Sequence, residues 1–114
     1  MTEVEISREG EIAIVRTMQR VDTSNADLLE AELIKLLGTG ARLLVFDLSG
    51  TKYIASSGLR ILLSTAKKLA NSGGKMALSG LNPQVREVFT IAGFDRIFKI
   101  YPSLEEAVKG VSPK

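Results

Sequence analysis

Two adjacent serines, Ser56 and Ser57, stand between a short loop and an apolar helical pattern, and Gly58 follows them. Hydroxyls at such a position can cap the helix, act as nucleophiles, bind a phosphate group, or accept one by phosphorylation. The N-terminus of a helix carries free N–H groups and a partial positive charge, which favour an anion there. The rest of the sequence discriminates between these four uses.

Helix capping is the simplest role for a serine at the start of a helix, because serine is among the preferred N-cap residues. Capping accounts for one hydroxyl of the pair and leaves the second without a role. Gly58 would lie in the first turn, where glycine lowers helix propensity by about 1 kcal/mol relative to alanine. A small residue there favours the close approach of a partner or another chain to the serines.

Two further uses lack the residues that they need. Residues 54–58 read I-A-S-S-G, which fails the G-x-S-x-G motif of hydrolases at Ile54, and the chain has no His to act as the base. The phosphate-binding motifs G-x-x-x-x-G-K-[ST] and G-x-G-x-x-G are also absent. A small nucleotide-binding protein stays as the alternative from a different functional class.

Phosphorylation needs no catalytic group in this chain. The helix dipole tolerates a phosphate at an exposed helix start, so the modification need not unfold the domain. It replaces a neutral hydroxyl with a group of charge about −1.5 to −2. A partner packed on that surface would be expelled by desolvation and by repulsion between like charges, so the serines could form a binding switch.

The composition supports a regulatory role over an enzymatic one. The chain of 114 residues has no Cys and no His, so we expect no catalytic residue, no metal site and no cofactor. Trp is absent and basic residues are scattered around a net charge of +2, which predicts no direct binding of nucleic acid. No apolar run is long enough to cross a membrane and the N-terminus is not a signal peptide, so we expect no membrane insertion and a cytoplasmic location.

The elements that position the serines follow from the hydrophobic pattern. Val4 and Ile6 alternate with polar residues, residues 8–11 have turn chemistry, and residues 12–15 are apolar, so residues 3–18 predict a β-hairpin. A continuous apolar run that ends at Asp47 predicts a strand with both faces covered. Short strands are expected at 75–79 and 97–101. The resulting order β-β-α-β-α-β-α-β-α predicts a single α/β domain over residues 1–111, followed by a tail, 112–114. Its mixed sheet would join the antiparallel hairpin to parallel strands and pack with about four helices.

Three helix starts have recognisable capping residues. Ser24 with Asp27 and Ser103 with Glu106 have the spacing of a capping box. Asn82 followed by proline is a good N-cap and first-turn pair.

Functional loops of open α/β sheets gather beyond the carboxyl ends of parallel strands. Three loops should therefore share one rim of the sheet: residues 21–24, 49–57 and 79–82. That rim would gather the polar residues Asp22, Thr23, Ser56 and Ser57, with Lys52 and Tyr53 nearby.

The stretch LLVFDLSGTKYIASSGLRILL, followed by GGKMALSGLNPQVREVFTIAGFDRIFKIYPSLEEAV, resembles the STAS domain, and in particular stand-alone bacterial anti-sigma factor antagonists. The resemblance covers about residues 3–111. It implies that the unphosphorylated protein binds an anti-sigma factor that is also a serine kinase, which frees the sigma factor. It further implies that this kinase phosphorylates the first serine of the pair and that a PP2C-type phosphatase reverses the reaction.

Carried over to this sequence, the resemblance makes Ser56 the phosphate acceptor, and Asp22 matches the family's Asp at the end of the second strand. The partner-binding residues that we expect are Asp22, Thr23, Ser56, Ser57, Gly58 and Arg60, in a monomer or weak dimer. Ala55 departs from the Asp or Ser that often precedes the acceptor, and Gln19 replaces a usual Gly. An accessory subunit of a transport ATPase or signalling assembly, working without phosphorylation, is the alternative within the fold.

Overall fold

The computed structural model describes residues 4–113. The first residue of the predicted hairpin, residues 1–3 of the predicted domain and Lys114 of the predicted tail lie outside the described residues. The strands are β1 (Glu5–Glu9), β2 (Ile12–Arg16), β3 (Arg20–Val21), β4 (Leu43–Asp47), β5 (Tyr53–Ile54), β6 (Lys75–Ser79) and β7 (Lys99–Tyr101). The helices are α1 (Ala26–Gly38), α2 (Ser56–Asn71), α3 (Pro83–Ile91) and α4 (Leu104–Val111), with a short 3-10 helix η1 (Phe94–Arg96).

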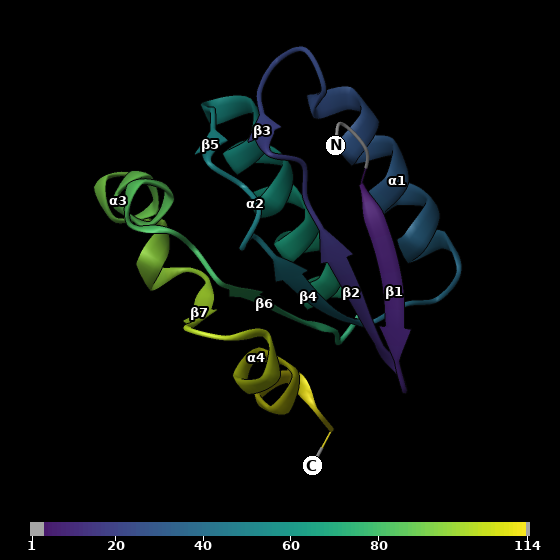
Figure 1. Cartoon of the computed structure of the whole chain (residues 1–114). Helices are drawn as coiled ribbons and strands as arrows, with labels where there is room; N and C mark the ends of the chain where they lie inside the picture. The colour runs from purple at the N-terminus through teal and green to yellow at the C-terminus, as the bar shows by residue number, and fades with distance from the viewer. Residues whose placement is uncertain (1–3, 114) are drawn as a thin grey trace.

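The main sheet has five strands in the order β1-β2-β4-β6-β7 (Figure 1). β1 and β2 are antiparallel, and the pairs β2–β4, β4–β6 and β6–β7 are parallel. The central strand β4 is buried on both faces, which explains its uninterrupted apolar sequence. The predicted mixed sheet with four α-helices is confirmed.

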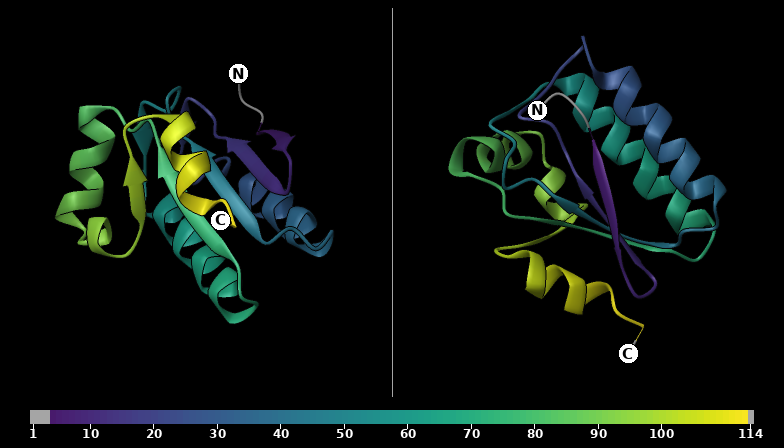
Figure 2. Two further views of the ribbon diagram at one scale, coloured as in Figure 1. Left: turned by 90° about the horizontal axis from the view of Figure 1, so that it is seen from below. Right: turned by 45° about the vertical axis from the view of Figure 1, so that its right-hand side comes forward.

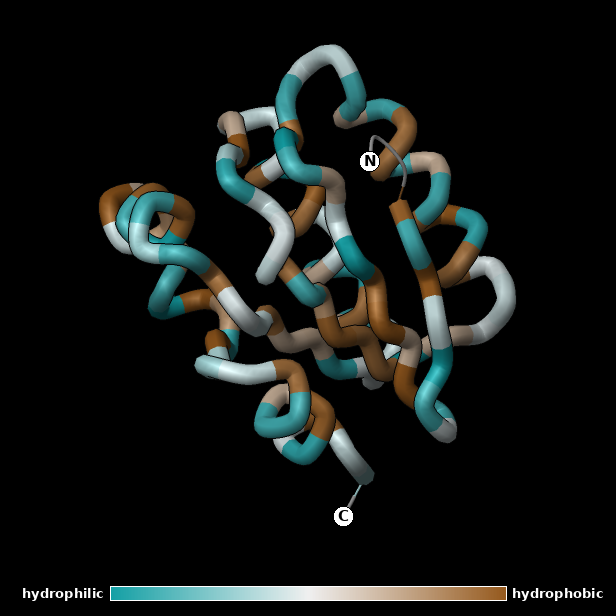
Figure 3. The backbone as a smooth tube through the Cα atoms, viewed as in Figure 1, coloured by the Kyte–Doolittle hydropathy of each residue, from teal (hydrophilic) through white to brown (hydrophobic). Residues whose placement is uncertain are grey.

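Helices cover both faces of this sheet. Figure 2 shows α1 and α2 together on one face and α4 alone on the other. The larger core joins α1, α2 and α3 to one set of alternating strand residues, and the smaller core joins α4 to the other set. Hydrophobic residues accordingly concentrate in the central strands (Figure 3). The loops at the carboxyl ends of the parallel strands are thus held on a rigid frame.

Two of the predicted helix caps are confirmed. The Asn82 side chain accepts a hydrogen bond from the Val85 N–H at 2.8 Å, and α3 begins at the following proline. The Ser103 hydroxyl accepts one from the Glu106 N–H at 3.2 Å at the start of α4. These caps could be predicted because each depends on residues that are close in sequence.

The predicted capping box at the start of α1 is wrong. Asn25, not Ser24, precedes the helix, and its side chain makes no capping hydrogen bond. The Ser24 hydroxyl donates to Oδ1 of Asp22 at 2.6 Å. The last strand is also shorter than predicted, because the N–H groups of Ile97 and Phe98 both donate to the Phe94 carbonyl at 3.0 Å and extend the turn of η1 before β7 begins.

Candidate functional site

A two-stranded parallel sheet, β3 with β5, brings the expected site together, and the sequence pattern did not predict it. Val21 pairs with Ile54 in this sheet, and the Ala55 N–H donates to the Val21 carbonyl at 2.8 Å. Asp22 therefore lies one residue beyond the paired positions and Ser56 two residues beyond them. The turn before α1 and the start of α2 emerge from the same end of this small sheet.

The start of α2 has no side-chain cap. Ser56 is the first helical residue, and the preceding N-cap position is held by Ala55 in an extended conformation. The interpretation of either serine as the N-cap is therefore wrong. The Ala55 carbonyl accepts from the N–H groups of Gly58 and Leu59, whereas those of Ser56 and Ser57 have no acceptor within residues 4–113. Ser56 itself is exposed to solvent.

Ser57 and Gly58 face inward. The Ser57 hydroxyl is buried and has no hydrogen-bond partner among the described residues. A Cβ atom at Gly58 would lie 2.6 Å from Cγ1 of Val21 and 2.9 Å from Cγ1 of Ile54. Gly58 is therefore needed for close packing of α2 on β3 and β5. We expected Gly58 to make room for a partner. The structure shows instead that it makes room for β3 and β5 of the same chain.

A hollow of about 310 Å³ lies between the N-terminal halves of α1 and α2. It brings together three of the predicted partner-binding residues, Thr23, Ser57 and Arg60. The other lining residues are Ala26, Asp27, Glu30, Ile61 and Ser64. Asp22 and Ser56 do not line the hollow, and each is the chain neighbour of a residue that does. Arg60 is exposed and makes no hydrogen bond or ion pair within the described part of the chain.

Asp22 is held by its own turn. Its Oδ1 atom accepts from the Ser24 hydroxyl at 2.6 Å and from the Ser24 N–H at 3.0 Å. The Arg20 Nε atom donates to Oδ2 at 3.4 Å. The Ser24 hydroxyl, followed by the Ser24 N–H and the Arg20 guanidinium, lowers the pKa of Asp22 although burial opposes the shift. Asp22 is thus a stable carboxylate at neutral pH.

Arg20 is a site residue that the sequence did not indicate. Its guanidinium carbon lies 4.4 Å from the centre of the Tyr53 ring, which is itself exposed. This cation–π contact and the ion pair with Asp22 fix the arginine at the end of β3. The presence of Arg20 two residues before Asp22 is a weak signal in the sequence. Only the pairing of β3 with β5 shows that Arg20 lies beside Tyr53.

The third loop of the expected rim, residues 79–82, reaches the second loop but not the serines. The Asn82 amide donates to the Thr51 carbonyl at 3.0 Å, and Gly80 packs against Ser49. These contacts hold the early part of the 49–57 loop. The rim is therefore divided, and the candidate site belongs to its other half, formed by β3, β5 and the start of α2.

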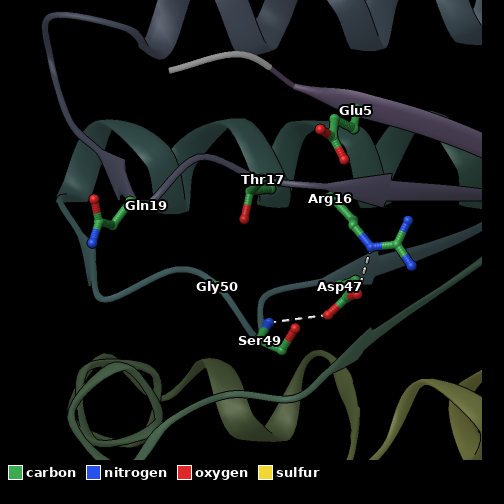
Figure 4. A pocket seen from close by; sticks show the side chains of 7 residues that line it. All are labelled: Glu5, Arg16, Thr17, Gln19, Asp47, Ser49 and Gly50. Carbon is green, nitrogen blue, oxygen red and sulfur yellow. Dashed lines mark hydrogen bonds and ion pairs between the residues drawn. The ribbon is translucent and has the colours of Figure 1, made fainter. Parts of the chain in front are cut away.

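A second hollow, of about 380 Å³, lies at the carboxyl ends of β2 and β4 (Figure 4). Nε of Arg16 lies 3.1 Å from Oδ2 of Asp47, and Oδ1 of Asp47 accepts from the Ser49 N–H at 3.0 Å. One carboxylate oxygen thus closes the turn after β4 and the other ties the end of β4 to β2, so the role of Asp47 is structural. Within residues 4–113, no cluster of three or more potential ligand side chains could hold a metal ion, and no helix could cross a membrane.

Known proteins resemble this chain along most of its length. The family described as the STAS domain matches residues 3–107. A Bordetella bronchiseptica protein named as an anti-sigma factor antagonist, BtrV, is 46% identical over 87 residues, which are 76% of this chain and 75% of that protein. The anti-sigma-F factor antagonist RsfB of Mycobacterium tuberculosis is 26% identical over 108 residues, which are 95% of this chain and 88% of RsfB.

The fold is shared with a solved relative. A crystal structure of a Thermotoga maritima protein, also named as an anti-sigma factor antagonist, superposes with a TM-score of 0.89 at 26% sequence identity. The superposition covers 95% of this chain and 93% of the other. The matched family, the curated relatives and the fold agree with one another. The chain belongs to the STAS domain family.

Proposed function

We propose that this protein is an anti-sigma factor antagonist, which binds an anti-sigma factor with serine-kinase activity and is switched off when that kinase phosphorylates Ser56. The observation that carries the proposal is the exposed hydroxyl of Ser56 at the first position of an uncapped helix, in a STAS domain whose relatives are named anti-sigma factor antagonists. The protein acts as a cytoplasmic binding module and not as an enzyme.

The geometry of α2 supports reversible modification of Ser56. An exposed hydroxyl is accessible to a kinase, which transfers the γ-phosphoryl group of ATP to Oγ and releases ADP and the hydroxyl proton. The free N–H groups of Ser56 and Ser57 and the helix dipole favour the resulting negative charge. A PP2C-type phosphatase would restore the hydroxyl by hydrolysis.

The proposed partner surface consists of the exposed Thr23, Ser56 and Arg60 with the half-buried Asp22 and Ser57. Gly58 is buried against β3 and β5, so its contribution is to let α2 sit where it presents Ser56. A phosphate of charge about −1.5 to −2 in this surface would expel a packed partner by desolvation and charge repulsion.

Mass spectrometry after incubation with ATP and the cognate kinase tests the assignment of the acceptor. The wild-type protein should gain one phosphate on Ser56, and Ser56→Ala should gain none. Ser57→Ala is the matched control and should still be phosphorylated. Full phosphorylation of Ser56→Ala, or a wild-type phosphate at a different residue, would overturn the proposal.

Partner binding tests the switch itself. Ser56→Asp should weaken binding to the anti-sigma factor in calorimetry while leaving the melting temperature nearly unchanged, because an exposed acid is favourable in the first turn of a helix. Ser56→Asn, which has a similar size and no charge, should retain binding. Unfolding of Ser56→Asp would mean that the role of the serine is mainly structural.

A further inference from the structure

We propose that Arg60 binds the phosphate of phosphorylated Ser56, so that the modified protein holds its own phosphate along one face of α2. This inference rests on the proposed function of Ser56 and adds the residue that receives the phosphate. The helix itself sets the pairing, because positions four residues apart on a helix are neighbours, with Cβ atoms about 5–6 Å apart.

The state of both side chains before phosphorylation favours this pair. Ser56 and Arg60 are exposed, and the intervening turn is regular helix. The Arg60 guanidinium has no hydrogen bond or ion pair within residues 4–113, so no existing contact must be broken. An anion placed N-terminal to a cation at this spacing has the favourable orientation relative to the helix dipole.

The surrounding charges leave Arg60 available. Asp27 and Glu30 of α1 line the hollow that Arg60 also lines, but neither carboxylate forms an ion pair with it. A phosphate carries more charge and can accept two parallel hydrogen bonds from a guanidinium, so it should outcompete these carboxylates. Arg20, by contrast, is already engaged by Asp22 and the Tyr53 ring.

Pairing of Arg60 with the phosphate means that phosphorylation would change the partner surface in two ways. Phosphorylation adds negative charge at Ser56, and it also withdraws the Arg60 guanidinium from an incoming partner. An acidic group of the anti-sigma factor that meets Arg60 in the unmodified state would lose that cation. The net change in charge is that of the phosphate alone, and the loss of the Arg60 contact adds to the effect of the phosphate on a partner that uses that cation.

The test uses the full chain with phosphoserine installed at position 56 by semisynthesis, so that no kinase is needed. A ³¹P NMR titration then gives the second pKa of the phosphate. In the wild-type background this pKa should lie about 0.5 pH unit below that in Arg60→Ala, the size expected for an exposed ion pair. Arg60→Lys should keep part of the shift, and high salt should remove it.

Two measurements make the result specific. Arg42→Ala removes an exposed arginine next to β4, at the opposite end of the sheet, and should leave the phosphate pKa unchanged. The Nε–H signal of Arg60 should move on phosphorylation. Equal phosphate pKa values in the wild-type and Arg60→Ala backgrounds would overturn the inference. Failure of a kinase to modify Ser56 would instead contradict the proposed function and leave this result standing.

Discussion

The starts of α2 and α3 are built in opposite ways. At α3, Asn82 caps the helix through the Val85 N–H, and proline occupies the first helical position. At α2, Ala55 stands at the cap position without a polar side chain, the first two N–H groups lack acceptors among residues 4–113, and Gly58 lies in the first turn. Local sequence stabilises the first of these helix starts and weakens the second.

Tertiary contacts compensate at α2. Pairing of β3 with β5 fixes the residue before the helix, and the close approach of Gly58 to Val21 and Ile54 holds its first turn. A polar cap would satisfy the N–H groups that a phosphate can use instead. The difference teaches that α3 is optimised for stability, whereas α2 leaves an accessible helix terminus beside the proposed acceptor.

The largest expected effect is at the packing contact of α2. Gly58→Ala should lower the free energy of unfolding by about 2 kcal/mol, because the new Cβ would overlap Val21 and Ile54 and overpacking outweighs the gain in helix propensity. Gly38→Ala in α1 is the control, since no described residue lies within 4 Å of the Cβ position there, and it should be neutral or stabilising. Urea denaturation measures both. Equal values for the two variants would show that α2 is not held by packing.

The helix caps should respond in opposite directions. Asn82→Ala should destabilise the protein by about 1 kcal/mol, because α3 loses its cap and the Thr51 carbonyl loses a donor. Ala55→Ser should stabilise it by about 0.5 kcal/mol or more by supplying the missing cap of α2. Thermal and urea unfolding check both values. A loss of stability in Ala55→Ser would contradict the description of α2 as uncapped.

A smaller gain is expected when the buried hydroxyl of α2 is removed. Ser57→Ala should raise the free energy of unfolding by about 0.5 kcal/mol, because the Ser57 hydroxyl is buried and has no partner in the part of the chain that the structure describes. The matched control is Ser79→Ala, which removes a buried hydroxyl that does donate to the Phe46 carbonyl and should therefore destabilise. If denaturation curves show both variants to be equally destabilised, the Ser57 hydroxyl has a partner in solution.

The smallest expected effect is the pH dependence of stability that comes from Asp22, in the turn before α1. The pKa of Asp22 is lower in the folded than in the unfolded protein, so its contribution to stability is present above the unfolded pKa and is lost as the pH falls through the folded pKa. Ser24→Ala removes the leading cause and should raise the pKa of Asp22 in an NMR titration. Asp22→Asn should abolish this part of the acid dependence. An unchanged Asp22 pKa in Ser24→Ala would contradict the hydrogen bond.

Sequence alone predicted much of the frame. The apolar runs of β2 and β4 predicted these strands, because a strand that is buried on both faces needs apolar residues at successive positions. The caps at Asn82 and Ser103 were predictable because they act over three residues. The same local logic failed at Ser24, where the hydroxyl donates to Asp22 rather than capping α1.

The sequence by itself therefore determined the mixed α/β fold and pointed to the pair Ser56 and Ser57, of which the family resemblance makes Ser56 the expected acceptor. Only the tertiary structure decided that residues 22 and 56 leave the same small sheet, since two-residue strands such as β3 and β5 have no periodicity to detect. The tertiary structure alone also explained why residue 58 is a glycine, because a Cβ atom there would overlap Val21 and Ile54. Contacts between distant segments depend on where the sheet places them, and no local pattern carries that information.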